Sequence, residues 1–385
     1  QLNIPGDGLS AKKINELVQE NSLICTICKS PFEEVTDFNL MFTTQVGPTG
    51  ETTAFLRPET AQMIFSQFKL ISDSARGKLP FGVGQIGKAF RNEISPRNFL
   101  FRLRELEQME LEYFTHPDKP SETVSEIENE EVLVFTKFAQ ANNEHQKKMT
   151  IKQLLADKII TNTHLAYFLG KGLQFLSSVG LRRENLRIRQ HLDDELAHYS
   201  DDCWDIEYKF PFGFKEMWGF ADRGTFDLDA HAKASGKEMF LMDDATGKKI
   251  NPRVVEPAIG LDRLFLAMMF DALSYSEERK NHVLSLSAKI APIQVGILPL
   301  LKKDGLRELG QEVYDSLKDT FRCFYDESGS IGKRYYRLDE TGCPFCVTID
   351  YDTKEKGTVT IRNRDSGEQE IVALTELKAK LQTII

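Results

Sequence analysis

The stretch Lys88-Ala-Phe-Arg-Asn-Glu93 decides the fold, together with Phe101-Arg-Leu-Arg-Glu105 and Gln108-Met-Glu110, which follow it closely. The surrounding residues, 82–93 and 100–114, read as two long strands on either side of a turn sequence, Ser95-Pro96-Arg97-Asn98. Within the second strand, residues 109, 111 and 113 are apolar and residues 108, 110 and 112 are polar. We therefore predict an antiparallel pair whose apolar face packs on a core and whose polar face is open.

Three arginines are interleaved with acids along this pair: Arg91, Arg102 and Arg104. One explanation is a ladder of exposed ion pairs, which would contribute little to stability. The other is an anionic ligand, because a guanidinium group stays charged and holds oxygens in a planar fork. The residues of this stretch alone leave both explanations open.

Two further stretches carry charge in apolar surroundings. Val254-Val-Glu-Pro-Ala-Ile-Gly-Leu-Asp-Arg263 places an arginine in an apolar helix, where a guanidinium needs an anion from the protein or from a ligand. Leu56-Arg-Pro-Glu-Thr-Ala-Gln62 places Glu59 in the first turn of a helix predicted over residues 58–71, where a simple contact with the helix dipole would also explain it.

Composition excludes several classes of protein. Of 385 residues, 41% are apolar and 28% are charged, which is typical of a soluble globular chain of two or three domains. No apolar run approaches the roughly 18–20 residues that cross a bilayer, so we expect no membrane association. The net charge of −9 excludes a basic coat for nucleic acid, although a local basic groove can still bind RNA.

The rest of the chain suggests two domains. A helix is predicted over residues 9–20, with Ser10 as its N-cap. Six acids and one base in Asp118–Glu131 indicate a surface insertion, which we extend to about residues 118–200 and which carries helical patterns at Leu133–His145, Ile151–Lys158 and Leu165–Val179. Residues 203–228 and 253–256 have strand character, and 260–275 reads as a buried helix. After Ala291, strands alternate with helices, which predicts a small α/β domain over 291–385.

The cysteines indicate a reducing compartment. Six in a chain of this length do not form a disulfide framework, and no signal peptide is visible, so we expect a cytoplasmic protein. Cys25/Cys28 and Cys343/Cys346 have the spacing of metal half-sites. Zinc at Cys25/Cys28 is an alternative that the sequence does not favour, because the second pair opens a strand-like run more than 300 residues away.

Together the charged stretches resemble a known family. Phe90-Arg-Asn-Glu93 is similar to motif 2 of class II aminoacyl-tRNA synthetases, and Gly260-Leu-Asp-Arg263 is similar to motif 3. Leu56–Gln62, Phe90–Arg97, Glu107-Gln-Met-Glu110 and Val255-Glu-Pro257 resemble the dimeric type of glycyl-tRNA synthetase. The resemblance begins near Phe38 and includes a C-terminal anticodon-binding domain, with Ala291-Pro-Ile-Gln-Val and Phe345-Cys-Val-Thr-Ile-Asp350.

The resemblance implies both architecture and activity. We expect an α+β catalytic domain built on an antiparallel sheet over residues 1–290, followed by a small α/β anticodon-binding domain over 291–385. The implied enzyme is a glycine–tRNA ligase, which activates glycine with ATP to glycyl-adenylate and transfers it to the 3′ end of tRNA(Gly). Glycine, ATP, Mg²⁺ and tRNA(Gly) are the implied ligands, and a homodimer is the implied assembly.

The family also implies the residues that contact ATP. Arg91 would hold the α-phosphate and the carboxylate, and Arg263 would hold the γ-phosphate and stack near adenine, which makes these two the catalytic residues. Glu216 would help to place Mg²⁺, which neutralises phosphates. The full ATP-binding group is Arg91, Asn92, Glu93, Phe101, Arg102, Leu103, Arg104, Glu105, Leu106, Glu216, Met217, Gly260, Leu261, Asp262 and Arg263.

A pocket for glycine must exclude every larger side chain, because it has no side chain of its own to hold. The family carries over three acids around the glycine ammonium, and these acids also fill the space of a β-carbon. The implied glycine-binding residues are Glu59, Gln108, Glu110, Arg223, Glu256 and Ala258.

The chain departs from the family pattern in three places. Leu106 stands where a phenylalanine usually packs on adenine, and Ala258 stands where a serine usually lies near glycine. Motif 1, which builds the dimer interface upstream, does not occur in the sequence, and residue 1 is Gln. We therefore expect a fragment or processed form, whose own activity the sequence leaves open.

Two other functions were weighed. A catalytically inactive, synthetase-like accessory protein that binds nucleic acid would share the architecture, but it need not keep Arg91, Glu93, Arg223, Glu256 and Arg263 together. A class II enzyme for serine or alanine is disfavoured by the acid-lined pocket.

Overall fold

The computed structural model describes residues 11–36, 38–243 and 246–385. The chain divides into two compact units. The first comprises the residues up to Glu59 together with Lys88–Glu105, and the second comprises Thr60–Gly87 and Leu106–Ile385. Among the described residues, no helix is both long enough and apolar enough to cross a bilayer.

The first unit holds little regular structure. Helix α1 (Ala11–Glu20) confirms the helix predicted over residues 9–20, while the predicted N-cap, Ser10, lies outside the described residues. Strands β1 (Thr43–Val46) and β2 (Thr52–Phe55) form an antiparallel hairpin. Its other segment contains a 3₁₀ turn, η1 (Phe99–Phe101), which occupies the start of the second predicted strand.

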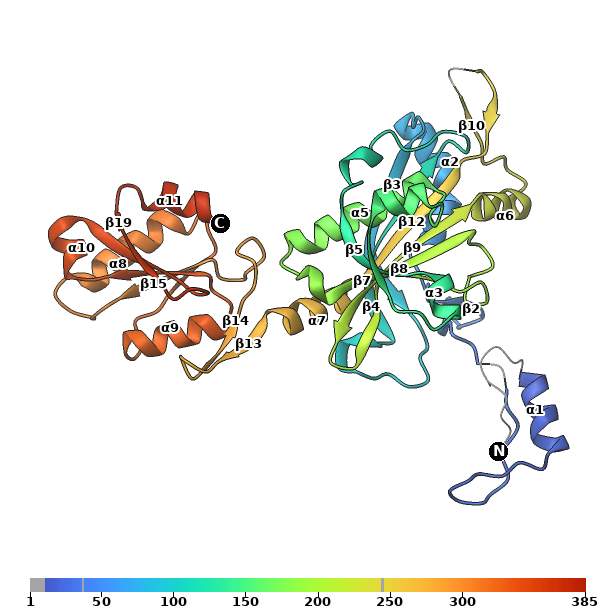
Figure 1. The fold of residues 1–385 in the computed structure, drawn as a ribbon, viewed down its shortest axis with the longest axis horizontal. Helices are drawn as coiled ribbons and strands as arrows, with labels where there is room; N and C mark the ends of the chain where they lie inside the picture. The colour runs from blue at the N-terminus through green and yellow to red at the C-terminus, as the bar shows by residue number, and fades with distance from the viewer. Residues whose placement is uncertain (1–10, 37, 244–245) are drawn as a thin grey trace. The chain divides into compact units, whose positions relative to one another are not determined.

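An eight-stranded sheet is the centre of the second unit (Figure 1). Its order is β3-β4-β12-β9-β8-β7-β5-β6, and the pair β5–β7 is parallel. The strands are β3 (Phe81–Phe90), β4 (Glu105–Thr115), β12 (Arg253–Gly260), β9 (Gly213–Gly224), β8 (Asp202–Phe210), β7 (Leu186–Gln190), β5 (Glu131–Phe135) and β6 (Lys147–Thr150). The predicted catalytic architecture, a largely antiparallel sheet with helices, is confirmed.

The two predicted strands are present as β3 and β4, but β4 starts at Glu105 rather than at residue 100. The reason is local: Asn98 and Phe99 have φ of 57° and 53°, a left-handed conformation that a strand cannot contain. The loop between the strands is therefore longer than the turn sequence alone suggests.

The prediction of an open polar face on β4 was wrong. Gln108, Glu110 and Glu112 are 6%, 4% and 0% exposed, whereas Met109 and Leu111 on the other face are only half-buried. Polar and apolar residues alternate along β4 as predicted, but other elements cover its polar face. Acids buried in this way need compensating partners.

Helix α5 (Thr163–Ser178) covers the opposite face of the sheet and confirms the helix predicted at Leu165–Val179. Its leucines at 165, 169, 173 and 176 are fully buried. Gly172 allows the close approach, because a Cβ there would lie 2.8 Å from the ring of Phe220. Helix α5 therefore covers one face of the sheet with apolar side chains, and the polar residues of β4 lie on the other face.

The expectation of a surface insertion was wrong for residues 131–190, because β5, β6 and β7 from this stretch join the central sheet. The helix predicted over Leu133–His145 is replaced by β5 and a short helix, α3 (Lys137–Ala141). The apolar residues Val132 and Val134 alternate with exposed or half-buried neighbours, which is a strand pattern. The other short elements here are η2 (Val124–Glu126), α4 (Ile151–Ala156) and η3 (Arg183–Asn185).

Helix α2 (Ala61–Ala75) buries Ala61, Ile64, Phe65 and Phe68, as predicted. It begins at Ala61, so Glu59 precedes the helix and does not occupy its first turn. Residues 226–228 were expected to continue a strand but open helix α6 (Phe226–Ser235), which is followed by the small hairpin of β10 (Leu241–Met242) and β11 (Lys249–Ile250).

The helix predicted over 260–275 is α7 (Leu261–Ala272), and it is only partly buried, because Phe265 is 52% exposed. A hairpin of β13 (Leu273–Ser276) and β14 (Asn281–Leu284) follows. Its loop residue Arg279 donates to Asp339 and to the carbonyl of Arg364. The hairpin is therefore tied to the C-terminal region, and the predicted boundary between residues 290 and 291 stays a prediction.

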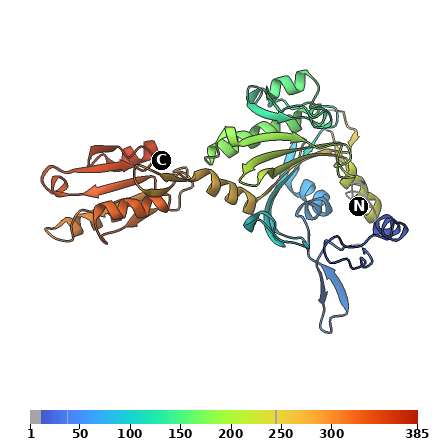
Figure 2. The ribbon, with the colours of Figure 1, turned by 60° about the horizontal axis from the view of Figure 1, so that its bottom comes forward.

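The C-terminal residues form a five-stranded mixed sheet of order β16-β15-β17-β18-β19 (Figure 2). Side chains of α8 and α11 share a core with Val295 and Ile297, while Leu338 of α9 packs with Leu298 on the other face. The predicted α/β fold is confirmed. The elements are β15 (Val295–Pro299), α8 (Leu306–Leu317), β16 (Cys323–Tyr325), α9 (Ile331–Glu340), β17 (Phe345–Ile349), α10 (Tyr351–Lys356), β18 (Thr358–Asn363), β19 (Gln369–Ala373) and α11 (Leu377–Ile384).

Candidate active site

Strand register lines up the polar face of the sheet in rows. Ala258 of β12 lies opposite Glu110 of β4 and Gly219 of β9. In the next row, Glu256 lies opposite Ala221 of β9. Directly opposed residues project to the same side of a sheet. Small residues therefore occupy the centre of this face, and Glu110 and Glu256 lie next to them.

Glu110 is held by the start of α2. The backbone N–H of Thr60 donates to Oε2 of Glu110 at 2.8 Å, and the Thr60 hydroxyl donates to the same oxygen. Thr60 is the N-cap residue of α2, but its side chain serves Glu110 instead of the helix. These hydrogen bonds stabilise the charged form of a carboxylate that is 4% exposed.

Arg223 is a deeply buried cation of the face and is 1% exposed. Its Nε and Nη2 donate to the two oxygens of Asp227 at 2.6 and 2.9 Å, and its Nη1 donates to Glu256. Burial disfavours the charged guanidinium, but the hydrogen bond to Asp227 and the field of Glu256 raise the pKa of Arg223. The group is thus permanently charged at the bottom of the sheet face.

Aromatic rings cover the same guanidinium. The Arg223 carbon Cζ lies 3.9 Å from the ring centre of Tyr199 and 5.2 Å from that of Phe65. Gln62 of α2 donates to Asp227 at 3.0 Å and contacts His231 at 2.9 Å. The position of Arg223 is therefore fixed from several sides.

Glu112 is the deepest acid of the face. It is fully buried, and neither carboxylate oxygen has a hydrogen-bond partner among the described residues. Desolvation and the charge of Glu256 raise the pKa of Glu112 well above its ordinary value, against the opposing field of Arg223.

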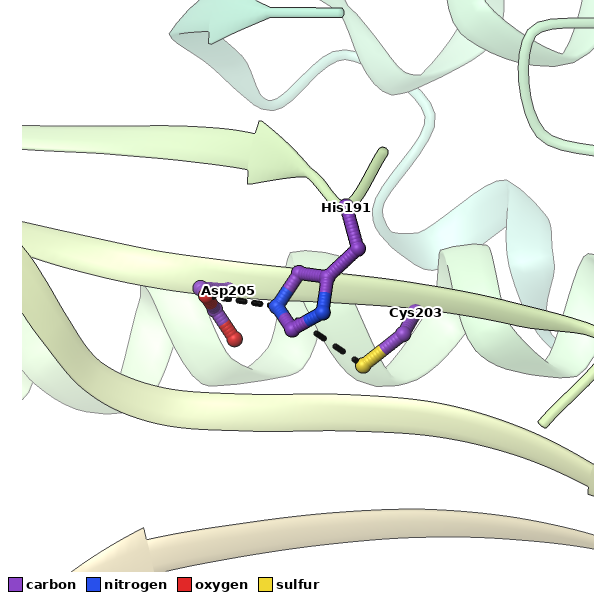
Figure 3. Close-up of side chains that lie close together, drawn as sticks. All are labelled: His191, Cys203 and Asp205. Carbon is purple, nitrogen blue, oxygen red and sulfur yellow. Dashed lines mark hydrogen bonds and ion pairs between the residues drawn. The ribbon is translucent and has the colours of Figure 1, made fainter. Parts of the chain in front are cut away.

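A second group of titratable side chains lies further along the face (Figure 3). His191 Nε2 is 2.8 Å from Asp205 Oδ2 and 3.9 Å from Cys203 Sγ. Burial raises the pKa of Asp205 to about 6, although its hydrogen bond with His191 acts in the opposite direction. Imidazole, thiolate and carboxylate are donors that zinc accepts, and these atoms lie within 4.8 Å of one another, so they could hold a metal ion.

No third metal ligand joins Cys25 and Cys28 among the described residues. Cys343 and Cys346 are buried in an apolar cluster with Leu338. That surrounding suits packed thiols rather than a metal site.

The motif 3 arginine pairs with the hairpin β8–β9. Arg263 Nη1 lies 3.0 Å from Glu216 Oε2 and donates to the Glu216 carbonyl at 3.0 Å. The Glu216 side chain is 51% exposed, and a carboxylate oxygen is a ligand that Mg²⁺ accepts. Asp262 accepts from the backbone N–H of Glu107 at 2.9 Å and ties α7 to β4.

The motif 2 residues lie in the first unit. Arg91 is exposed, and its Nε donates to the carbonyl of Pro58 at 3.1 Å. Arg104 Nε donates to the carbonyl of Glu93 at 3.0 Å, and Arg102 forms an ion pair with Glu93 at 3.4 Å. The backbone N–H of Asn92 donates to the carbonyl of Leu40 at 2.7 Å. This network orders the loop while leaving the Arg91 side chain at the surface.

The ion-pair ladder considered for this stretch is present only in part. Lys88 pairs with Glu105 at 2.8 Å, with both side chains more than half exposed, so the pair contributes little. Arg91 and Arg104, by contrast, donate to backbone carbonyls. A ladder of charges therefore explains Arg102, which pairs with Glu93, but not Arg91 or Arg104.

Several of the predicted glycine-binding residues share one face of the sheet. Glu110, Glu256 and Ala258 lie in adjacent rows, and Arg223 donates to Glu256. Gln108 is buried on the same strand face, and its Oε1 has no hydrogen-bond partner among the described residues. Glu59 belongs to the first unit. Their roles in binding stay predictions.

Sequence reasoning did not assign Thr60, Glu112 or Asp227 to the site. The alternation that grouped Glu112 with Glu110 was a usable signal, because residues two apart on a strand share a face. Asp227 carried no signal, since the three residues between it and Arg223 include the turn between β9 and α6. Thr60 could have been found from its place in the motif Leu56–Gln62, where it directly follows Glu59.

Comparison with protein families gives two matches in order along the chain. Residues 42–269 match the tRNA synthetase class II core domain (G, H, P, S and T). Residues 294–384 match an anticodon binding domain.

Individual proteins agree with these families. A glycine–tRNA ligase of Caldanaerobacter subterraneus subsp. tengcongensis is 43% identical over 96% of this chain and 72% of its own length, and one of Alkaliphilus oremlandii is 41% identical over 97% and 73%. A prolyl-tRNA synthetase of Cryptosporidium parvum shares the fold, with a TM-score of 0.59 and 15% identity over 90% of this chain and 61% of that one. With this identity along nearly its whole length, and a core that matches the class II model, the chain belongs to the class II glycine–tRNA ligases.

Proposed function

We propose that the buried acidic face of the second unit is the glycine pocket of this ligase, and that the chain forms glycyl-adenylate before it charges the 3′ end of tRNA(Gly). The observation that carries this proposal is that Glu110 and Glu256, 4% and 9% exposed, flank the small residue Ala258. A cation stabilises two buried acids by compensating their charge, and the glycine ammonium is a cation of suitable size.

Exclusion of larger amino acids follows from the same construction. The central positions are Ala258, Gly219 and Ala221, so the backbone forms the floor, and carboxylates occupy the sides. A carboxylate next to an ammonium favours glycine, whereas a β-carbon in the same space would desolvate the acid without replacing its hydrogen bonds. Selection of glycine over larger amino acids would thus come from the hydrogen bonds that a β-carbon takes from the acids, as well as from a steric clash.

Substitution of Glu110 by Gln tests the pocket. We expect the KM for glycine to rise about 10–150-fold, because a charge-assisted hydrogen bond contributes roughly 1.5–3 kcal/mol. Gln keeps the volume and can still accept from Thr60, so exclusion of alanine should survive. The measurement is ATP–pyrophosphate exchange with glycine and ATP varied in turn.

Only the glycine KM should move in this experiment. Glu131→Gln is the matched control, because Glu131 is an exposed strand glutamate that pairs with the exposed Lys148 at 3.5 Å. An unchanged glycine KM in the Glu110 variant, with normal folding, would remove Glu110 from the pocket.

For ATP, we propose the roles implied by the family for the motif residues. Arg91 would hold the α-phosphate and Arg263 the γ-phosphate, and Arg263 would exchange its present partner, Glu216, for the phosphate. Glu216 would then help to bind Mg²⁺, as class II enzymes typically require. Charged groups in fixed positions are suited to a step in which negative charge builds on phosphorus.

We further propose that the C-terminal α/β region binds the anticodon stem of tRNA(Gly). Deleting residues 273–385 is expected to leave ATP–pyrophosphate exchange largely intact while transfer to tRNA falls severely. The cut precedes the hairpin β13–β14, because Arg279 of that hairpin would otherwise lose Asp339 and the Arg364 carbonyl. If the soluble truncated protein charged tRNA as well as its parent, this role would be wrong.

The family likeness also supports a homodimeric, cytoplasmic enzyme, which we include in the proposal. Size-exclusion chromatography with light scattering measures the assembly directly.

A further inference from the structure

Glu112 has no assigned task in the proposed function, yet it is the most deeply buried acid of the sheet face. Val255 lies opposite Tyr113, and Ala258 lies opposite Glu110, so the register places Glu256 across from Glu112. Two carboxylates on opposed residues of neighbouring strands repel each other. Neither oxygen of Glu112 receives a hydrogen bond from the described residues.

The charges around Glu112 do not balance. The titratable and charged groups that act on it are Glu110 from its own strand, Glu256 from β12, Arg223 from β9 and Asp227 from α6. Cys203 of β8 adds a buried thiol near Glu256. If every acid were ionised, four carboxylates would face one guanidinium, which is already bonded to Asp227 and Glu256.

A buried carboxylate without a partner lowers its free energy by taking up a proton. Glu110 accepts two hydrogen bonds from Thr60, and Asp227 and Glu256 accept hydrogen bonds from Arg223. Glu112 alone lacks such a donor among the described residues, and burial raises its pKa. Among these acids, Glu112 is therefore the one that protonation stabilises most.

We propose that Glu112 holds a proton in the glycine-free pocket and releases it to solvent when the glycine ammonium enters, so that glycine binding is coupled to proton release. The inference rests on the proposed glycine pocket. In the step, the Glu112 O–H bond breaks, the carboxylate keeps the electron pair, and the buffer accepts the proton. The incoming ammonium replaces the positive charge that leaves.

Proton release sets the direction of a pH effect. Below the raised pKa of Glu112, glycine must displace a bound proton, so its affinity rises with pH by up to about tenfold per unit. Above that pKa the proton is already gone, and the dependence disappears. Replacing Glu112 by Gln removes the titrating group at nearly constant volume, and the pH dependence should vanish with it.

The test is calorimetric titration of glycine into the full chain at one pH, in phosphate, HEPES and Tris buffers. The dependence of the apparent enthalpy on the buffer's ionisation enthalpy gives the number of protons released. We expect up to about one proton for the unmodified protein, none for Glu112→Gln, and an unchanged value for Glu131→Gln. A zero slope for the unmodified protein, or an equal slope for the Glu112 variant, would overturn the inference.

Two readouts keep the test decisive. If Glu112→Gln does not fold, the affinity of the unmodified protein for glycine between pH 6 and 8 serves instead, and a flat profile overturns the proposal. Failure of the proposed function looks different: glycine would then give no binding heat and no ATP–pyrophosphate exchange, and both proposals would fall. Glycine binding without proton release would reject only the role of Glu112.

Discussion

Replacing Arg91 by alanine is expected to reduce glycine-dependent ATP–pyrophosphate exchange about 10²–10³-fold. One charged contact made mainly in the transition state typically contributes about 3–4 kcal/mol, and Arg91 is the proposed ligand of the α-phosphate. The fold should survive, because the side chain is exposed and donates through Nε to the carbonyl of Pro58. Circular dichroism and single-turnover exchange measure the two effects separately.

Arg91→Lys separates charge from geometry in the same experiment. Lysine keeps the positive charge but loses the planar fork, so an intermediate loss is expected. Near-normal exchange in a folded Arg91→Ala protein would show that the α-phosphate is held by other residues. An equal loss in both variants would show that the fork, rather than the charge, is essential.

The chemistry of the site could be predicted from the sequence because its residues stand in short, ordered stretches. Arg91, Glu93 and Arg263 were assigned from their motifs, and Glu110 and Glu256 were assigned together although 146 positions separate them. The structure brings Glu110 and Glu256 onto one face by the register of β4 with β12. Register is a property of the folded sheet, and no local pattern contains it.

The burial of the polar face could not be predicted from alternation. Period 2 tells which residues share a face, but the usual assignment of the polar face to solvent rests on the cost of burying charge. That cost is offset by the hydrogen bonds from Thr60 to Glu110 of β4, and by the hydrogen bond from Arg223 to Glu256 of the neighbouring β12. These partners come from α2 and β9, which are distant in sequence, so a local reading assigned the wrong face to solvent.

Strand β5 shows a second limit of local patterns. Residues 131–135 alternate as a strand does, but the next residues begin a helix at Lys137, and a window that spans both favours a helix. Pairing decides the outcome: β5 is the parallel neighbour of β7 and the antiparallel neighbour of β6. A strand inside a mixed sheet is stabilised by partners on both sides, which its own sequence does not name.

Burying the acids around Arg223 lowers the stability of the fold, because charged groups lose their hydration. Acids on β4, β12 and α6 converge on a single guanidinium, and aromatic rings exclude water from it. Such clusters are poor sources of stability, because desolvation offsets the attraction between the charges. In the proposed pocket, their value would lie in the negative charge that they present to a substrate cation. The same arrangement makes Arg223, which donates to two of these acids, a sensitive position of the sheet face.

Arg223→Met is therefore expected to lower the free energy of unfolding of the sheet by about 3–5 kcal/mol, the typical cost of leaving a buried charge without its partner. Asp227 and Glu256 would lose their hydrogen bonds at 4% and 9% exposure. Protonation neutralises a carboxylate that has lost its cation, so the deficit should be smallest at low pH and should grow as the pH rises. Glycine activation should be lost as well.

The two tryptophans of the chain make this measurable in a protein of several domains. Trp204 lies on β8 and Trp218 on β9, so urea unfolding followed by tryptophan fluorescence reports on the strands that carry Arg223. Arg253→Met is the matched control: Arg253 pairs with Asp201 and Asp222 but is 31% exposed, and its loss should cost less. Combining Arg223→Met with Asp227→Asn and Glu256→Gln should restore most of the stability without restoring activity, because the stranded charges are then gone. A free energy of unfolding of Arg223→Met within about 1 kcal/mol of that of the parent protein would contradict this prediction. It would show that the acids around Arg223 are not buried charges that depend on it, and the electrostatic argument for the glycine pocket would fail.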